Sequence, residues 1–267
     1  MFIHLKTLPV LYAKLSEQID MTKVTAVGVS TRPRNVDGSY MPVFVCGTSF
    51  ANVIADTLGV PCYEFSHQDG HIMAGIHSCG QYALLDEPFL SVHLSGGTTE
   101  ILKCEYNNFG FEQEIVGATN DISAGQFIDR IGVSMGLKFP CGAALEKMAE
   151  QSDNRYILPT SVKDTYMSFS GVETKVQGLI GKENHNDLAL GVFACVAKSL
   201  VKALNNAVKN TGIKKILVVG GVASNSIIHK YLKENVKAKV YFASREFSTD
   251  NAVGIGILTS LKAKGNG

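Results

Sequence analysis

The chain has 267 residues, with 25 lysines and arginines against 24 aspartates and glutamates, and a formal net charge of +1. This length is enough for one large domain or two lobes with sizeable cores. The near-zero charge excludes a broad basic field, so any contact with nucleic acid has to be local or supplied by a partner.

The sequence also indicates where the protein works. It contains neither an N-terminal apolar signal segment nor a long apolar run, which predicts a cytoplasmic protein with no membrane attachment. Its 6 cysteines are scattered, and they form no Cys-x-x-Cys pair. We therefore expect them to be small core residues of a reducing compartment and not a disulfide framework or a zinc ribbon.

In the first third of the chain, helical and strand patterns alternate. Leucines at helical spacing predict an amphipathic first helix, and Gly59 is a typical C-terminal stop for the second helix. The expected elements are a helix over 5–19, a strand over 23–30, a buried helix over 43–58, a strand over 61–65 and a further helix that begins near His67.

The rest of the chain opens with a strand meander and continues with alternating helices and strands. The expected elements are strands over 89–94, 99–106 and 111–116, a helix over 124–135, a less regular stretch over 137–186, a helix over 187–209, a strand over 214–219, a helix over 226–234, a strand over 239–242, and a final helix over 249–261 with Ser248 or Thr249 as its N-cap.

The first third repeats only the later part of the series that follows residue 86. This order predicts a duplicated α/β lobe whose first copy lacks its opening strands. Residues 1–85 would form the incomplete first lobe, and residues 86–267 would form the second lobe, with an insertion around 137–186.

The stretch Ser66–His71 contains two histidines four residues apart, after a strand-like run and before a helix-like run. On a helix, His67 and His71 would lie on one face, where two imidazoles can share a metal ion. The alternative explanation is that one of the two histidines caps a helix and the other packs in a core. Asp250 is either a helix cap or a third, carboxylate ligand that would leave metal positions open for substrate or water.

Two glycine-containing turns provide sites where the backbone can approach a ligand. Ser95–Thr99 lies between two predicted strands, and Gly220–Asn225 follows a buried strand and precedes a helix. Such turns hold phosphate oxygens or a nucleoside, although both are also compatible with ordinary connections. Asp129 would accept hydrogen bonds from ribose hydroxyls, or else pair with Arg130 or Lys138 as a solvated charge.

Together these stretches resemble one family, the TsaD-type or Gcp-like tRNA N6-adenosine threonylcarbamoyltransferases, once described as O-sialoglycoprotein endopeptidases or glycoproteases. The similarity extends over nearly the whole chain in the same order. The residues that carry it are His67–His71, Leu94–Thr99, Asp121, Ala124, Gly125, Phe127, Asp129, Leu145–Ala149, Ser168–Gly171, Gly220–Asn225 and Thr249–Asn251.

The resemblance implies an actin/hsp70-like, ribonuclease H-like α/β fold of two lobes with nucleotide in the cleft between them. It implies one divalent metal ion per chain, iron or zinc, held by His67, His71 and Asp250. ATP or threonylcarbamoyl-adenylate would be the nucleotide ligand. Its phosphate and threonylcarbamoyl parts would contact His93, Leu94, Ser95, Gly96 and Gly97, and its adenosine part would contact Asp129, Gly142 and Asn225.

The same resemblance implies transfer of the threonylcarbamoyl group to N6 of adenosine 37 of tRNA. It implies tRNA, a shorter paralogue and a small ATPase as partners, and a homodimer is a further possibility. The family normally begins with a strand and an Asp- or Glu-Thr-Ser turn, whereas this chain starts at the helix that normally follows. Arg32-Pro33-Arg34 stands where Gly-Pro-Gly is usual. These differences indicate a short, diverged member.

Other functions stay open. A diverged paralogue would serve as a non-catalytic scaffold that binds a nucleotide or a partner chain. A metallopeptidase would need Glu after the first histidine as general base, but Gln68 occupies that position. An ATP-dependent sugar or acetate kinase of the same fold would not need the histidine pair.

Overall fold

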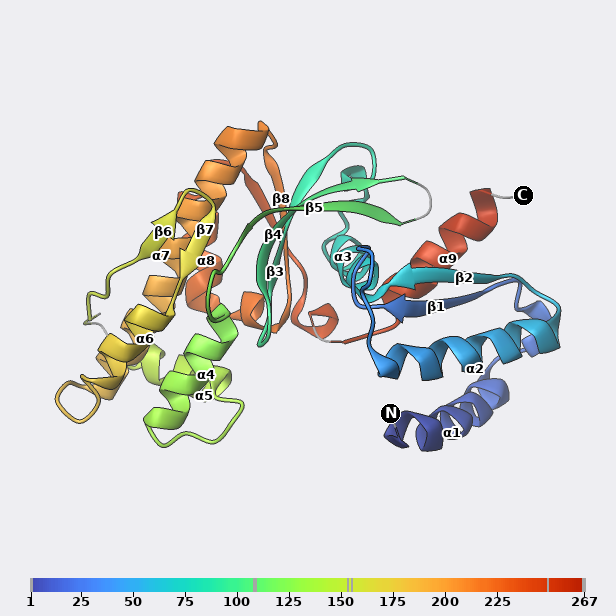
Figure 1. Cartoon of the computed structure of the whole chain (residues 1–267), viewed down its shortest axis with the longest axis horizontal. Helices are drawn as coiled ribbons and strands as arrows, with labels where there is room; N and C mark the ends of the chain where they lie inside the picture. The colour runs from blue at the N-terminus through green and yellow to red at the C-terminus, as the bar shows by residue number, and fades with distance from the viewer. Residues whose placement is uncertain (1, 108–109, 153, 155, 249, 266–267) are drawn as a thin grey trace. The chain divides into compact units, whose positions relative to one another are not determined.

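A computed structural model describes residues 2–107, 110–152, 154, 156–248 and 250–265 (Figure 1). The chain divides into two compact units. The first contains Met1–His77, Tyr106–Glu112 and Asp250–Gly267, and the second contains Ser78–Glu105 and Gln113–Thr249. This grouping differs from the expected division at residues 85 and 86 because the C-terminal helix belongs with the first third of the chain. The lobe boundary itself stays a prediction.

The first unit is built on a pair of parallel strands, β1 (Val27–Arg32) and β2 (Cys62–Ser66). Its helices are α1 (Phe2–Gln18), α2 (Pro42–Leu58), α3 (His67–Cys79) and α9 (Val253–Gly265), and a 3₁₀ turn spans Met21–Lys23. α9, red in Figure 1, packs against β1 and β2. A Cβ atom at Gly28 would lie 1.7 Å from the hydroxyl oxygen of Thr259, so glycine is what permits this close approach.

The second unit contains a five-stranded sheet in the order β5-β4-β3-β8-β9. The strands are β3 (Phe89–Leu94), β4 (Thr99–Tyr106), β5 (Phe111–Ala118), β8 (Lys215–Val219) and β9 (Lys239–Phe242). β4 pairs antiparallel with β3, whereas β8 is parallel to both β3 and β9. This is the mixed sheet that the meander followed by alternating strands and helices predicts.

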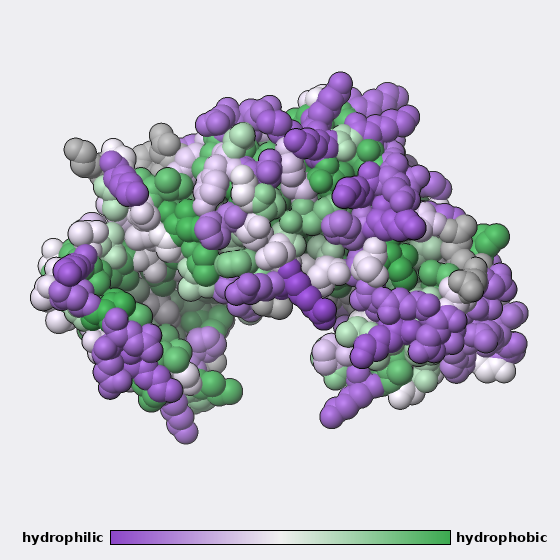
Figure 2. Space-filling view, turned by 180° about the vertical axis from the view of Figure 1, so that it is seen from behind, coloured by the Kyte–Doolittle hydropathy of each residue, from purple (hydrophilic) through white to green (hydrophobic). Residues whose placement is uncertain are grey.

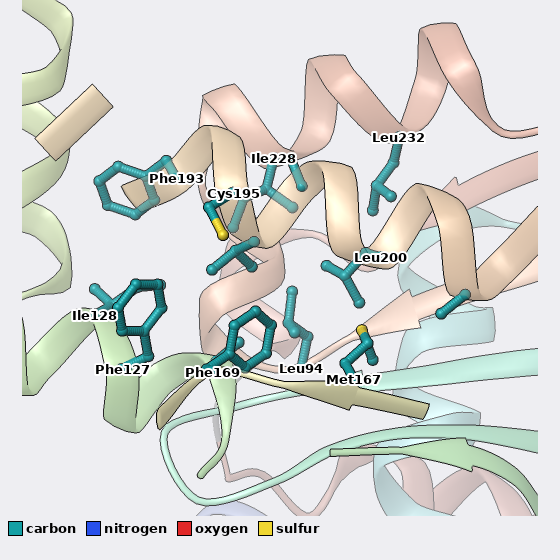
Figure 3. Close-up of a cluster of buried hydrophobic side chains, with 14 of the residues drawn as sticks. Leu94, Phe127, Ile128, Met167, Phe169, Phe193, Cys195, Leu200, Ile228 and Leu232 are labelled. Atoms are coloured by element: carbon teal, nitrogen blue, oxygen red, sulfur yellow. The ribbon is translucent and has the colours of Figure 1, made fainter. Parts of the chain in front are cut away.

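The helices of the second unit enclose its core. They are α4 (Ala124–Ser134), α5 (Gly142–Glu150), α6 (Ser170–Gln177), α7 (His185–Thr211) and α8 (Ser226–Asn235), with 3₁₀ turns at Tyr82–Leu84, Gly221–Ser224 and Arg245–Phe247. α7 contacts α5 and α8, and many of its residues are fully buried. Figure 3 shows side chains from α4, α7, α8 and β3 pointing toward one another, among them Leu94, Phe127, Phe193, Leu200 and Leu232.

Hydrophilic residues cover much of the face seen in Figure 2, and apolar residues occur in groups among them. In the described part of the chain, every helix is either too short or too polar to cross a membrane.

Most predicted elements are found within a few residues of their expected bounds, but the last helix is not. It was expected over 249–261 and begins at Val253. The backbone N–H of Val253 donates to the side chain of Asn251, and the hydroxyl of Ser248 donates to the carbonyl of Ser244. Asp250 therefore precedes the helix and does not lie in its first turn, and Ser248 is not its N-cap. Thr249 lies outside the described residues.

Three other expectations need correction. The strand expected over 23–30 starts only at Val27, after a 3₁₀ turn. The stretch over 137–186 is more regular than expected, because it forms α5, α6 and a hairpin of β6 (Ser161–Lys163) and β7 (Tyr166–Ser168). α2 is only partly buried, with Ala51 and Ala55 its fully buried residues.

Candidate functional site

Two histidines and an aspartate converge in the first unit. The Nε2 atoms of His67 and His71 are 3.1 Å apart, and the Oδ1 atom of Asp250 is 3.3 Å from each of them. The side chain of His71 is 8% exposed and that of Asp250 is 86% exposed. One side of the three donors is therefore buried and the other side is open.

The beginning of α3 places the histidines. Ser66 precedes the helix, and its hydroxyl accepts a hydrogen bond from the backbone N–H of Asp69 at 3.0 Å. The carboxylate of Asp69 accepts one from the backbone N–H of Ser66 at 2.8 Å. This reciprocal pair is a capping box, which fixes where the helix starts. His67 and His71 then lie one turn apart on the same face, as their spacing predicts.

A glycine contact places the aspartate. Gly254 in the first turn of α9 packs directly on α3, since a Cβ atom there would lie 1.9 Å from the carbonyl oxygen of Gly70. Asp250 comes four residues before Gly254 and lies beside the histidine pair as a result.

The three donors fit a transition-metal ion. Ligand atoms held about 2.0–2.1 Å from a tetrahedral zinc ion are roughly 3.3–3.4 Å apart, close to the separations found here. Burial lowers the pKa of His71, and so does the charge of His67, while Asp250 opposes the shift. A lowered pKa favours the neutral imidazole that ligates metals. Two imidazoles and a carboxylate suit zinc and non-haem iron alike.

The neighbouring acidic residue is not available as a general base. Both carboxylate oxygens of Asp69 accept hydrogen bonds from backbone N–H groups or from Asn35, and the residue is 1% exposed. Asp69 is therefore not available as the general base that the peptidase hypothesis needs, and Gln68 occupies the position after His67.

In the second unit, the Ser95–Thr98 turn joins β3 to β4. The backbone N–H of Ser95 donates to the carbonyl of Thr98, and the backbone N–H of Thr98 donates to the Ser95 hydroxyl. The Ser123 hydroxyl, at the N-cap of α4, donates to the carbonyl of Gly96. A Cβ atom at Gly125 would lie 2.4 Å from the carbonyl oxygen of Ser95, so the start of α4 packs tightly on this turn.

Beside the turn is a cavity of about 260 Å³. It brings together four of the residues predicted to bind substrate, namely Gly96, Asp129, Gly142 and Asn225. The other four predicted residues are not among its lining residues. Leu94 is fully buried in the core, His93 is half-buried on β3, and Ser95 and Gly97 lie in the turn itself.

Asn225 is the most informative residue of the cavity. It is 5% exposed, and its Oδ1 atom accepts a hydrogen bond from Ile228 as the N-cap of α8. Its Nδ2 group is buried and has no partner among the described residues. Since a buried donor without a partner is costly, this group favours a ligand with an acceptor atom in the cavity.

Asp129 makes a contact that the sequence did not suggest. Its Oδ1 atom accepts a hydrogen bond from the backbone N–H of Cys141 at 2.7 Å, whereas Arg130 pairs with Glu173. The expected ion pair of Asp129 with Arg130 is not formed, because Arg130 pairs with Glu173 on α6 instead. Among the described residues, Asp129 forms no ion pair with Lys138 either.

Sequence reasoning gave no role to three further lining residues, Glu146, Phe193 and Arg245. Glu146 had a usable signal, because it stands four residues after Gly142 and so lies on the same face of α5. Its carboxylate accepts hydrogen bonds from the backbone N–H and hydroxyl of Ser226. Phe193 and Arg245 carry no local signal and are brought in by tertiary packing.

Comparison with known proteins identifies the family. Residues 3–257 match the model of the TsaD family, described as tRNA N6-adenosine threonylcarbamoyltransferase. The chain belongs to the TsaD family. A relative of that name from Riemerella anatipestifer is 32% identical over 91% of this chain and 74% of its own length. Another, from Christiangramia forsetii, is 30% identical over 93% of this chain and 76% of its own length.

Solved structures agree on the fold of this TsaD family member. HypF from T. kodakarensis superposes with a TM-score of 0.64 at 15% identity, covering 92% of this chain and 42% of that protein. Component A of (R)-2-hydroxyglutaryl-CoA dehydratase from Acidaminococcus fermentans gives a TM-score of 0.50 at 16% identity, covering 80% of this chain and 74% of that one. The expected α/β fold of the actin/hsp70-like ATPase type is confirmed.

Proposed function

We propose that this chain transfers a threonylcarbamoyl group from threonylcarbamoyl-adenylate to N6 of adenosine 37 in tRNA, with one iron or zinc ion held by His67, His71 and Asp250. The convergence of these three donors within 3.3 Å of one another is the observation that carries the proposal. The names of the relatives, all tRNA N6-adenosine threonylcarbamoyltransferases, supply the substrate.

The cavity of the second unit would hold the adenosine part of the donor. Asn225 would donate its buried Nδ2 group, which has no partner within the described part of the chain, to an acceptor atom of the nucleoside. Asp129 uses only Oδ1 in the hydrogen bond to Cys141, so Oδ2 would accept from a ribose hydroxyl. Backbone N–H groups of the Ser95–Gly97 turn and the N-terminus of α4 would stabilise the phosphate charge.

The transfer is a substitution at the carbamoyl carbon. The N6 nitrogen of the acceptor adenosine forms a bond to that carbon, the bond from the carbon to the phosphate oxygen breaks, and AMP leaves with the electron pair. N6 gives up one proton to solvent. A divalent metal bound by the three ligands would polarise the carbamoyl oxygen as a Lewis acid. The chain's own contribution is to hold both reactants in contact and to exclude competing water.

We also propose that the chain acts together with a partner chain of its pathway. None of the residues of α1 is buried, and the helix exposes large apolar side chains at Phe2, Ile3, Leu5, Val10, Leu11 and Leu15. Such a surface fits the shorter paralogue that the family resemblance implies. Light scattering of the purified chain measures its mass in solution and distinguishes the two possibilities, because a homodimer would appear as twice the chain mass.

Elemental analysis of the purified protein tests the metal site. We expect about one iron or zinc per chain in the wild type and none in Asp250→Ala. Asp56→Ala is the matched control, since Asp56 is an exposed aspartate on α2 of the same unit. A wild type that takes up no metal after iron or zinc is added would contradict the proposal and favour a non-catalytic scaffold.

A further inference from the structure

The first turn of α3 contains a buried carboxylate that the proposed reaction does not use. Asp69 is 1% exposed and lies two residues after His67 and two before His71. Its Oδ2 atom accepts the backbone N–H of Ser66 at 2.8 Å, and its Oδ1 atom accepts the backbone N–H of Phe111 at 3.2 Å. The carboxylate thus joins the metal-binding helix to the start of β5.

Asn35 also donates to this carboxylate. Its Nδ2 group donates to both oxygens of Asp69, at 2.9 and 2.8 Å, and to the carbonyl of Phe111 at 3.1 Å. Its Oδ1 atom accepts a hydrogen bond from Nη2 of Arg32 at 2.8 Å. Both ends of the Asn35 amide are therefore engaged, and the residue connects three separate segments of the first unit.

The loop that carries Asn35 also contacts the helix through its backbone. The N–H of Gln68 donates to the carbonyl of Pro33 at 3.1 Å. The loop between β1 and α2 therefore contacts α3 at two successive residues, Gln68 and Asp69, which directly follow His67. A helix held in this way at its first turn has little freedom to rotate about its axis.

Such rotation matters because metal sites tolerate little displacement. The distance from the metal ion to each ligand atom stays within about 0.2 Å of its preferred value. The burial of Asp69 and its several donors fix the carboxylate in place, and the helix backbone transmits that constraint to the residues on either side. Groups that orient metal ligands without touching the metal contribute strongly to metal affinity.

We infer that Asn35 and Asp69 are positioning residues, which set the first turn of α3 so that His67 and His71 are pre-arranged for the metal. The inference rests on the proposed metal site. It also assigns a role to the loop that contains Arg32-Pro33-Arg34, because Arg32 orients the amide of Asn35.

The test compares the zinc affinity of the full chain with that of Asn35→Ala and Asp69→Asn, by competition with a chromophoric chelator. We expect each variant to bind zinc about 10- to 100-fold more weakly. Asn107→Ala is the matched control, because the Asn107 side chain donates to Glu112, the residue that follows Phe111 in β5. It should bind zinc with wild-type affinity.

A purely structural role would give a different pattern. In that case Asn35→Ala would unfold at a lower temperature in metal-free buffer but would bind zinc with wild-type affinity once folded. The visible absorption spectrum of the cobalt-substituted protein adds a second measurement, since we expect the variants to change its band positions. Unchanged spectra together with unchanged affinities would overturn the inference.

Two outcomes need separate interpretation. If Asn35→Ala fails to fold, Arg32→Ala replaces it, because that variant keeps Asn35 and removes the hydrogen bond that orients it, together with the one from Arg32 to Thr31. Wild-type zinc affinity in Arg32→Ala would then overturn the inference. If the wild type itself binds no zinc, the proposed metal site fails and the inference fails with it. If the wild type binds zinc and all variants bind it with the same affinity, only the positioning role is overturned.

Discussion

The contact between α3 and α9 gives a sharp test of how the metal site is assembled. A Cβ atom at Gly254 would lie 1.9 Å from the carbonyl oxygen of Gly70 and 2.8 Å from the backbone nitrogen of Ala74. Carbon and oxygen atoms in close contact are about 3.3 Å apart, so Gly254→Ala requires the helices to separate by roughly 1.4 Å. Both atoms that block the methyl group belong to the backbone and cannot rotate away.

The displacement has two measurable effects. Overpacking of this kind destabilises a folded protein by about 1–3 kcal/mol. The shift also carries Asp250 away from the histidines by several times the roughly 0.2 Å that a metal site tolerates. We therefore expect Gly254→Ala to lose at least tenfold in zinc affinity, about 1.4 kcal/mol, while the chain stays folded.

Gly256→Ala is the matched control. It lies on the same helix, and a Cβ atom there meets nothing within 4 Å. Alanine is also the better helix former, by up to about 1 kcal/mol, so this variant should melt at the wild-type temperature or higher. Chelator competition and thermal unfolding in metal-free buffer measure both effects. Wild-type zinc affinity in Gly254→Ala would refute the close packing of α3 and α9 as the cause of the site geometry.

Further predictions concern the second unit. Gly125→Ala should weaken AMP binding, because its Cβ would collide with the Ser95 carbonyl oxygen at 2.4 Å. Gly171→Ala should leave AMP binding unchanged, because a Cβ atom there meets nothing within 4 Å. Calorimetry measures AMP binding in both variants. Asn225→Ala should lose AMP binding and about 1 kcal/mol of stability as an N-cap, seen in urea unfolding. Although burial raises the pKa of Asp121, hydrogen bonds from Ser170 and neighbouring N–H groups lower it below 3.8 overall. Its contribution to stability is present above pH 3.8 and is lost as the pH falls through the lower folded value, so Asp121→Asn should flatten the acid limb of a stability–pH curve.

The sequence predicts local features of the site well because they depend on spacing along one element. The four-residue interval between His67 and His71 needs only a helix to bring the rings together. The turn at Ser95–Thr98 is likewise expected from the strands on either side. The spacing within one helix does not identify the third ligand, since Asp250 comes from the far end of the chain, where a helix cap was the alternative explanation and only the family resemblance favoured the ligand.

Other features depend on tertiary contacts that no local pattern encodes. The last helix begins only at Val253, whose backbone N–H donates to the Asn251 side chain, although Thr249 and Asp250 looked like a typical first turn. Asn35 stands in a loop that resembles an ordinary connection, and its hydrogen bonds to Asp69 exist only after the β1–α2 loop folds over α3. Arg245 approaches the cavity in the same way, through packing of a short turn.

The central claim is best tested by a single-turnover transfer assay. Metal-loaded wild type and Asp250→Ala are each mixed with labelled threonylcarbamoyl-adenylate and unmodified tRNA, in the presence of a lysate that lacks this chain so that partner proteins are supplied. Our account predicts N6-threonylcarbamoyladenosine at position 37 with the wild type and none with the variant. No product with the wild type, while metal is bound, would contradict it, and so would equal product with the two proteins.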